Sequence, residues 1–212
     1  YKNFLTPFTR IICLSDSEEE ILAQMHEKWR YNTKLAIKKW VQIEKSEANS
    51  DNLDTWMRLL DETLERDSFS GNSRDYYEAF IKNIEIANQG WLYFARFEWR
   101  IIAAAIFVFT QERAIYYYGA SSSDIWDRKV FAPYLLQWEA MKQAKSQGIL
   151  QYDFLWIAET NNAKDPLAGV SFFKSRFGGQ RVKLPKKIFI PLSWKCSIFV
   201  LMQKIKNLLK SR

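Results

Sequence analysis

The chain contains little of what metal sites, disulfide frameworks and membrane spans require. Its 212 residues include one histidine, His26, and two cysteines, Cys13 and Cys196, without a Cys-x-x-Cys pair. This scarcity argues against a zinc site and a disulfide framework, and it favours a reducing compartment such as the cytosol. No apolar run reaches the roughly 18 residues that a membrane-spanning helix needs. The sequence therefore predicts a soluble protein.

The beginning of the chain also lacks a start signal. The first residue is Tyr1 rather than methionine, and no basic segment followed by an apolar segment, as in a signal peptide, comes after it. We therefore expect that sequence upstream of Tyr1 has been removed.

Acidic residues are absent from the last part of the chain. Residues 171–212 contain eleven Lys or Arg and no Asp or Glu, and the whole chain carries a formal net charge of +7. A segment of one sign attracts polyanions, either nucleic acid or an anionic membrane surface. The alternative is a solvated basic face that only keeps the protein soluble.

The residues that are present have the pattern of a mixed α/β domain. Length allows one domain, or one domain plus part of another. Apolar periodicity predicts helices at 15–40 (with a break near Tyr31 and Asn32), 51–66, 74–88, 129–147 and 170–177. It predicts strands at 41–44, 91–97, 101–110, 113–118 and 151–158, with one or two more within 181–190 and a basic amphipathic helix at 195–210.

This order of elements is that of the GNAT acyltransferase fold. Three consecutive strands with short polar turns form an antiparallel meander, and the segment "GASSSD" is expected to end the third. We predict an α/β (α+β) fold of GNAT-like type, with a mixed, mostly antiparallel central sheet flanked by helices. Element order alone does not assign a function.

Four stretches taken together resemble the FemABX family. They are "EKWRYNTKLAIKKW", "YYYGASSSD", "APYLLQWEAMKQAKSQGILQYDF" and "AGVSFFKSRFGG". In that family a Gly-Ala-Ser turn precedes a long helix, a Tyr-Asp-Phe strand follows it, and a Gly-Val-x-x-Phe-Lys-x-x-Phe-Gly-Gly segment closes the site. All three features occur here in that order, and the likeness runs from about Thr9 to Ile190.

Relatives in the family contain two GNAT-like halves. The resemblance implies that residues 1–40 are the C-terminal helical part of a truncated first half. Residues 41–180 are then the second GNAT-like domain, and residues 181–212 are a closing strand and a basic C-terminal helix.

The resemblance implies an acyltransferase that moves an amino acid from aminoacyl-tRNA to the stem-peptide amine of a peptidoglycan precursor, which builds interpeptide bridges. No metal and no cofactor is implied. Acyl-CoA is disfavoured as donor, since Gly119–Ser123 holds one glycine and lacks the Gln/Arg-x-x-Gly-x-Gly/Ala loop that grips pyrophosphate. The implied partners are aminoacyl-tRNA and a nucleotide-linked or lipid-linked precursor.

Location and assembly follow less directly. The expected compartment is the cytoplasm, and contact with the inner face of the plasma membrane stays open. The oligomeric state is not indicated.

Lys174 and Phe173 are the candidate catalytic residues by this resemblance. An ammonium can neutralise charge on a tetrahedral intermediate or hold the tRNA terminus, and an aromatic ring can stack on the terminal adenine. The alternative is a surface lysine on a short helix, with Phe172, Phe173 and Phe177 as core residues.

Arg66, Tyr118 and Arg176 are the candidate substrate-binding residues. Arg66 matches a family Thr-x-x-Arg element that contacts precursor phosphate, to which a guanidinium fork is suited; the alternative is an arginine that caps its own helix. Tyr118 precedes the Gly-Ala-Ser segment and shares a strand face with Tyr116, so one of the two belongs to the core. Arg176 lies in the closing segment beside Lys174.

Two further residues carry weaker signals. Asp153 could act as a general base, but a strand carboxylate between two aromatic residues is more often a structural acceptor. His26 has no nucleophile paired with it and is expected to be ordinary.

Two other functions remain open at this stage. One is a Fem-like transferase with another acceptor. The other is a non-catalytic RNA- or membrane-binding module, for which the basic segment at 195–212 would form the interface helix.

Overall fold

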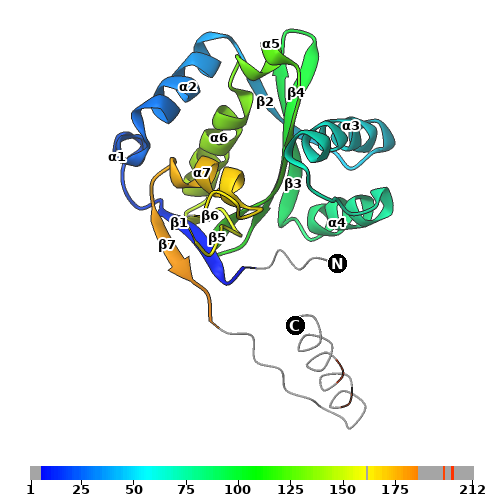
Figure 1. The fold of residues 1–212 in the computed structure, drawn as a ribbon. Coiled ribbons are helices and arrows are strands. Elements are labelled where there is room, and N and C mark those ends of the chain that lie inside the picture. The colour runs from blue at the N-terminus through cyan, green and yellow to red at the C-terminus, as the bar shows by residue number, and fades with distance from the viewer. Residues whose placement is uncertain (1–5, 161, 186–197, 199–201, 203–212) are drawn as a thin grey trace.

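A seven-stranded sheet lies between two layers of helices (Figure 1). The computed structural model describes residues 6–160, 162–185, 198 and 202. The strands are β1 (Phe8–Cys13), β2 (Gln42–Ser46), β3 (Gly90–Phe97), β4 (Arg100–Phe109), β5 (Arg113–Ser121), β6 (Gln151–Asp153) and β7 (Gln180–Lys183). The helices are α1 (Glu18–Gln24), α2 (Glu27–Lys38), α3 (Ser50–Asp67), α4 (Arg74–Ile86), α5 (Ile125–Arg128), α6 (Ala132–Ser146) and α7 (Ala168–Ser175).

The strand order is β2-β3-β4-β5-β6-β1-β7. Neighbouring strands are antiparallel except for β5 and β6, which are parallel, so the predicted meander β3-β4-β5 is confirmed. The sequence did not predict β1 as a strand. It lies between β6 and β7, in one sheet with the strands of residues 41–180. The division of the chain near residue 40 into two GNAT-like halves stays a prediction.

Each face of the sheet carries its own core. Helices α3 and α4 cover one face, and α2, α6 and α7 lie on the other (Figure 1). Adjacent residues of β4 show the two-residue alternation of a strand, because Ile106 belongs to the core cluster that holds Trp56 of α3, while Phe107 belongs to the cluster that holds Met141 of α6. The strand is buried on both faces, which explains why its sequence reads as a continuous apolar run.

The helical region before β2 breaks at His26 rather than near Tyr31, so the expected position of the break is wrong. Ser17 and Glu20 form a capping box at the start of α1, and α1 stops where Met25 turns extended. His26 then accepts a hydrogen bond from the Lys28 N–H through Nδ1, at 3.2 Å, and starts α2. A side-chain acceptor therefore starts a second helix directly after the first.

The Gly-Ala-Ser segment continues β5 instead of ending it, which corrects the expected strand end at Tyr118. Gly119, Ala120 and Ser121 pair with the alanines at 103–105 of β4. Because the side chains on both strands are small, no steric clash prevents this pairing. The strand ends instead at Ser121, before Asp124 caps α5.

The long helix begins later than predicted. Phe131 adopts a left-handed conformation with φ 61° and separates α5 from α6, which starts with Pro133 in its first turn. Gly148, with φ 76°, follows the C-terminal end as expected. In the part of the chain that the structure describes, no helix is both long and apolar enough to cross a bilayer. Most of the predicted basic helix at 195–210, and residues 186–190 of the predicted strand region at 181–190, lie outside the described residues.

Candidate active site

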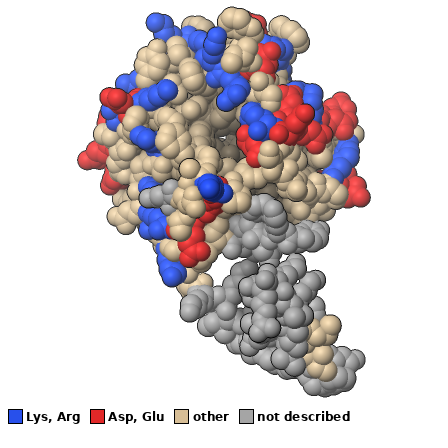
Figure 2. All heavy atoms as spheres, in the orientation of Figure 1, with Lys and Arg blue, Asp and Glu red and all other residues tan. Residues whose placement is uncertain are grey.

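Strands β5 and β6 separate after a short parallel pairing. Three residue pairs join them, from Arg113 with Gln151 to Ile115 with Asp153. Beyond that point β6 ends, whereas β5 continues to Ser121. Among the described residues, one edge of β5 therefore has no strand partner over residues 116–121, and the sheet is open there. Figure 2 shows a hollow near the centre of this view, between the side that carries α6 and α7 and the side that carries α3 and α4.

Lys174 reaches into this opening from α7. Its Nζ donates to the carbonyl oxygens of Leu155 at 3.2 Å and Trp156 at 3.0 Å, in the segment that follows β6. The same Nζ lies 5.6 Å from the centroid of the Tyr116 ring of β5. Lys174 therefore bridges the two chain segments that diverge. The residue is only 6% exposed, so the alternative of a surface lysine is wrong.

Burial changes the charge state of this lysine. The loss of hydration lowers the pKa of Lys174 from 10.5 to about 7, and the negative charge of Asp153 opposes the shift. At neutral pH the amine is then close to equal populations of its charged and neutral forms. Such a group can both donate and accept a proton, which an ordinary surface lysine cannot do at this pH.

Asp153 is held by structural partners. The hydroxyl of the buried Thr9 donates to Oδ1, the Leu155 N–H donates to the same oxygen at 2.8 Å, and Arg113 forms an ion pair with Oδ2 at 3.4 Å. Both oxygens of this carboxylate are therefore already engaged by donors from the surrounding fold. The geometry therefore favours the structural reading of Asp153, with its charge acting on Lys174.

The aromatic residues of α7 and of the turn after it divide into one exposed ring and two packed ones. Phe177 is fully buried and contacts Phe154, as the core alternative predicted. Phe172 is 53% exposed, so the prediction that it belongs to the core is wrong. Phe173 is partly buried, and the rings of Trp29, Tyr134 and Phe177 surround it.

Tyr116 and Tyr118 point to opposite faces of the sheet, contrary to the prediction. A β-bulge makes Phe107 pair with Tyr116 and Ile106 pair with Tyr118, so Tyr117 is the extra residue that reverses the alternation. Tyr116 packs with the core under α6, and burial raises its pKa above the usual range. The structure therefore brings Tyr116, and not Tyr118, to Lys174.

Tyr118 belongs to an aromatic cluster against α4. Its hydroxyl lies 3.2 Å from the Tyr76 hydroxyl and accepts from the Asn72 amide at 3.4 Å. Burial and the neighbouring tyrosines raise the pKa of Tyr118 well above its ordinary value. It stays a protonated hydrogen-bonding group at every physiological pH.

Arg66 binds the chain that follows β5. Its guanidinium donates to the carbonyl oxygens of Ser121 at 3.1 Å and Ser122 at 3.4 Å, and it forms an ion pair with Asp67 at 3.1 Å. The alternative of an arginine that caps its own helix is therefore not what the contacts show. The guanidinium lies beside the end of the open strand, with its fork directed at main-chain oxygens.

Arg176 lies at the end of α7 with its guanidinium 4.7 Å from the Phe172 ring centroid. Its carbonyl oxygen accepts from the His26 N–H at 2.8 Å, which ties α7 to the start of α2. His26 is thus a helix-capping residue, as expected of an ordinary histidine. Among the described residues, no three His, Cys, Asp or Glu side chains gather as metal ligands would.

The sequence did not identify two contributors to the site. Trp156 presents its carbonyl to Lys174 and its ring to Tyr117, at 5.7 Å between centroids. Leu155 holds a left-handed backbone with φ 50°, a strained conformation for a branched side chain. The only signal in the sequence was their position directly after the Tyr-Asp-Phe strand.

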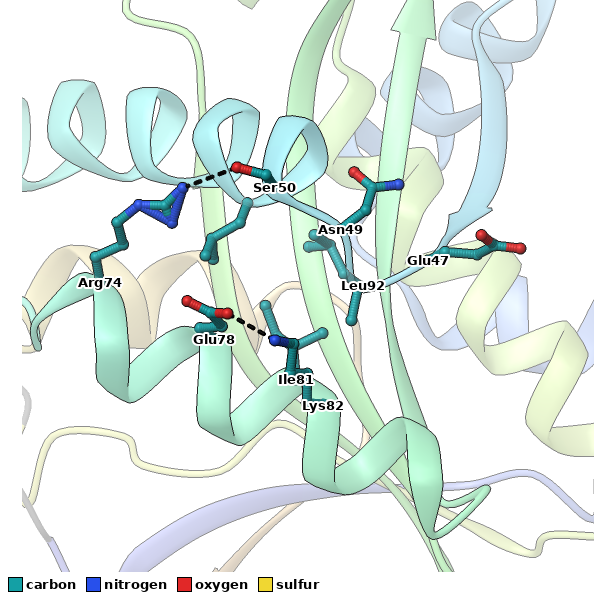
Figure 3. Close-up of a pocket in the computed structure, with 10 residues that line it drawn as sticks. Glu47, Asn49, Ser50, Arg74, Glu78, Ile81, Lys82 and Leu92 are labelled. Atoms are coloured by element: carbon teal, nitrogen blue, oxygen red, sulfur yellow. Dashed lines mark hydrogen bonds and ion pairs between the residues drawn. The ribbon is translucent and has the colours of Figure 1, made fainter.

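A separate hollow of about 230 Å³ lies on the other face of the sheet (Figure 3). Leu53, Ile81 and Leu92 form its floor, and these residues belong to the core under α3 and α4. Arg74 and Glu78 stand at its rim and point toward neighbouring polar side chains. It is smaller than the roughly 300–1,000 Å³ of typical ligand sites and does not contact Lys174.

Comparison with solved structures supports the fold. FemX matches with a TM-score of 0.78 at 18% identity, over 87% of this chain and 61% of FemX. A conserved protein of unknown function from Bacteroides thetaiotaomicron VPI-5482 matches with a TM-score of 0.54 at 9% identity, over 81% of this chain and 55% of that one. A protein from Clostridium difficile 630 described as a possible acetyltransferase matches with a TM-score of 0.52 at 11% identity, over 71% and 98%. The predicted GNAT-like acyltransferase fold is confirmed.

The comparison with sequence families covers nearly the whole chain. Comparison with curated proteins finds no match. The chain spans about 61% of the length of FemX. The pattern of the FemAB family matches residues 3–98 and 95–192. This chain therefore belongs to the FemAB family.

Proposed function

We propose that the chain is part of a transferase that moves an amino acid from aminoacyl-tRNA to the stem-peptide amine of a peptidoglycan precursor. The nitrogen of the acceptor amine attacks the ester carbonyl carbon and loses one proton, and the bond to the 3′-terminal ribose oxygen breaks as that oxygen gains a proton to leave as a hydroxyl. The ester is already activated, so the enzyme has to align the two substrates and stabilise an oxyanion.

The observation that carries this proposal is the buried lysine at the open strand edge. Lys174 lies where β5 and β6 diverge, on the motif that carries the family resemblance, with its pKa lowered to about 7. Its charged form would stabilise the oxyanion, and its neutral form would accept the proton of the attacking amine. The carbonyls of Leu155 and Trp156 hold the Lys174 amine in position for both roles.

The remaining predicted residues have different support. Phe173 has three aromatic neighbours, so we assign it to the wall of the site rather than to stacking on the terminal adenine. Phe172, more than half exposed and with Arg176 over its ring, is the better stacking surface. Arg66 would bind precursor phosphate only by exchanging its present main-chain partners.

The test is transfer of radiolabelled amino acids from a mixed aminoacyl-tRNA pool to nucleotide-linked and lipid-linked precursors. It compares the chain, the same chain extended upstream, Lys174→Met and a control, Lys164→Met. Lys164 is an exposed lysine of the loop before α7. We expect transfer by the parent and the control and a loss of at least about 100-fold in Lys174→Met.

Three outcomes would contradict the proposal. Equal transfer by Lys174→Met would remove the assigned role of Lys174. Transfer to another acceptor would keep the enzyme class and change the substrate. Absence of transfer by both lengths, with folding and tRNA binding intact, would indicate a non-catalytic binding module. In the proposal the reaction takes place in the cytoplasm, and the use of a lipid-linked precursor would bring it to the inner face of the membrane.

A further inference from the structure

Three tryptophans stand in solvent at one end of the molecule. Trp40, Trp99 and Trp126 are 85%, 78% and 68% exposed, although tryptophan is usually well buried. Ile37 and Ile125, 50% and 58% exposed, accompany them. The residues come from the end of α2, the turn between β3 and β4, and α5, which meet at the top of Figure 1. We call residues 37–40, 98–100 and 125–129 the tryptophan end.

Printed contacts join these three segments into one surface. Lys39 Nζ donates to the carbonyl of Lys129 at 2.9 Å, which links α2 to α5. Arg100 forms an ion pair with the buried Asp127 at 2.7 Å, which links the start of β4 to α5. The register of β2 with β3 sets Gln42 opposite Arg96, so Trp40 lies near the turn that bears Trp99. The three segments that bear the exposed tryptophans therefore adjoin one another.

The charge of the tryptophan end is positive. Besides Arg100, which pairs with Asp127, four basic residues lie on it, namely Lys38, Lys39, Arg128 and Lys129. The acidic side chains are mostly engaged, because Asp127 pairs with Arg100 and Asp124 accepts the N–H groups of Trp126 and Asp127. Glu98, in the turn, is the exposed acidic residue within it. Figure 2 shows blue spheres gathered at the same upper end.

Cations also sit directly beside the exposed rings. Lys129 Nζ is 4.3 Å from the centroid of Trp126, and the Arg100 guanidinium is 5.5 Å from that of Trp99. A ring with an ammonium or guanidinium above it is apolar on one side and charged on the other. Such pairs suit the boundary between headgroups and acyl chains, where tryptophan and basic residues both concentrate.

From these observations we propose that the tryptophan end docks the protein on an anionic lipid bilayer. The three rings and two isoleucines would enter the boundary of the acyl chains, and the four basic residues would contact anionic headgroups. The surface fits nucleic acid less well, because isoleucine offers no ring for base stacking. In the described chain the first strand, β1, and the last strand, β7, lie at one edge of the sheet. The opposite edge is formed by β2, the strand that follows Trp40. This proposal goes beyond the proposed function and does not require it.

The test is co-sedimentation with phosphatidylglycerol–phosphatidylcholine vesicles and with vesicles of phosphatidylcholine alone. The parent chain is expected to bind the anionic vesicles. The triple variant Trp40→Ala, Trp99→Ala, Trp126→Ala is expected to lose at least about tenfold in partitioning. A matched control, Ile86→Ala with Leu150→Ala, removes two exposed apolar side chains elsewhere and should bind as the parent does.

A charge-reversal pair gives an independent readout if the triple variant unfolds. Lys38→Glu with Arg128→Glu should weaken vesicle binding about tenfold or more, and Lys28→Glu with Lys164→Glu should not. Circular dichroism checks folding of each variant. Equal binding by the parent, the triple variant and the charge-reversal pair would overturn the proposal, since other basic segments would then explain binding. The proposal would also be overturned if the parent did not bind vesicles. It would likewise be overturned if the variants lost only tRNA binding or self-association and kept vesicle binding.

Discussion

At the scale of single residues, Lys174 has an unusual position. A buried ammonium has lost its hydration, and the structure compensates with two carbonyl acceptors, a ring and the distant charge of Asp153. The lowered pKa indicates that this compensation is incomplete. Functional groups are often kept at a cost to stability, whereas structural groups are not.

Lys174→Met is therefore expected to hold or raise the free energy of unfolding at pH 7. The thioether replaces an amine of similar length without its desolvation cost, which offsets the two lost hydrogen bonds. Denaturant unfolding measures the change. A loss of more than about 2 kcal/mol would instead identify Lys174 as a structural residue.

Gly119 is required by the ring beside it. A Cβ at this position would come 1.8 Å from the Tyr116 hydroxyl oxygen and 2.7 Å from the ring carbon that carries it. Gly119→Ala is expected to cost about 1–3 kcal/mol of stability, because the Tyr116 ring has to move. Adding Tyr116→Phe removes the closer contact and should recover part of the loss. A purely additive double variant in denaturant unfolding would contradict this coupling.

At the scale of elements, the end of α3 holds the end of the open strand. Thr63 donates to the Ser121 carbonyl and accepts from its N–H, Glu62 accepts from the Ser123 N–H, and Arg66 binds the carbonyls of Ser121 and Ser122. Because no described strand pairs with the other edge of β5 here, these bonds fix the rim of the opening. The residue predicted to bind phosphate is, in this structure, a support of the strand.

Arg66→Ala is expected to lower the free energy of unfolding by ~1–3 kcal/mol and to speed hydrogen exchange of the amides at 121–124. Arg66→Lys should recover less than half of this loss, because Nη1 binds both carbonyls while Nε and Nη2 bind Asp67 and the Ser121 hydroxyl, and a single ammonium cannot make all of these contacts. The control is Lys82→Ala, which removes an exposed ion pair on α4 worth at most about 1 kcal/mol. Unchanged exchange at 121–124 in Arg66→Ala would rule out the supporting role.

At the scale of the whole molecule, the buried lysine makes stability depend on pH. Its pKa is 10.5 when exposed and about 7 in the fold. Between these values the unfolded chain binds more protons than the native one, so the free energy of unfolding rises with pH. Buried tyrosines with raised pKa, such as Tyr152, act in the opposite direction above pH 10. The informative window is therefore about pH 7 to 9.5.

Lys174→Met should flatten this slope. Chemical denaturation at several pH values between 7 and 9.5 measures it for the parent and the variant. The parent is expected to gain stability across the window and the variant to change much less. Equal slopes would show that Lys174 keeps an ordinary pKa in the folded protein.

Much of the fold was predictable from local pattern. Apolar periodicity placed the meander, α3, α4 and α7 close to their observed ranges, and the Gly-Val-x-x-Phe-Lys motif located Lys174. Several errors lie where contacts with distant residues override the preference of the local sequence. The bulge at Tyr117, the strand through Gly119 and the left-handed Phe131 each depend on pairing or packing with distant residues.

By itself the sequence determined most of the order of elements, though not β1 or α5, as well as the family resemblance and the identity of the candidate residues, because these depend on residue types and short spacings. Only the tertiary structure decided that Lys174 is buried beside Tyr116, that Arg66 is engaged by main-chain oxygens, and that three distant tryptophans share one surface. Burial, pKa and surface clustering arise from contacts between segments far apart along the chain, which local periodicity does not encode.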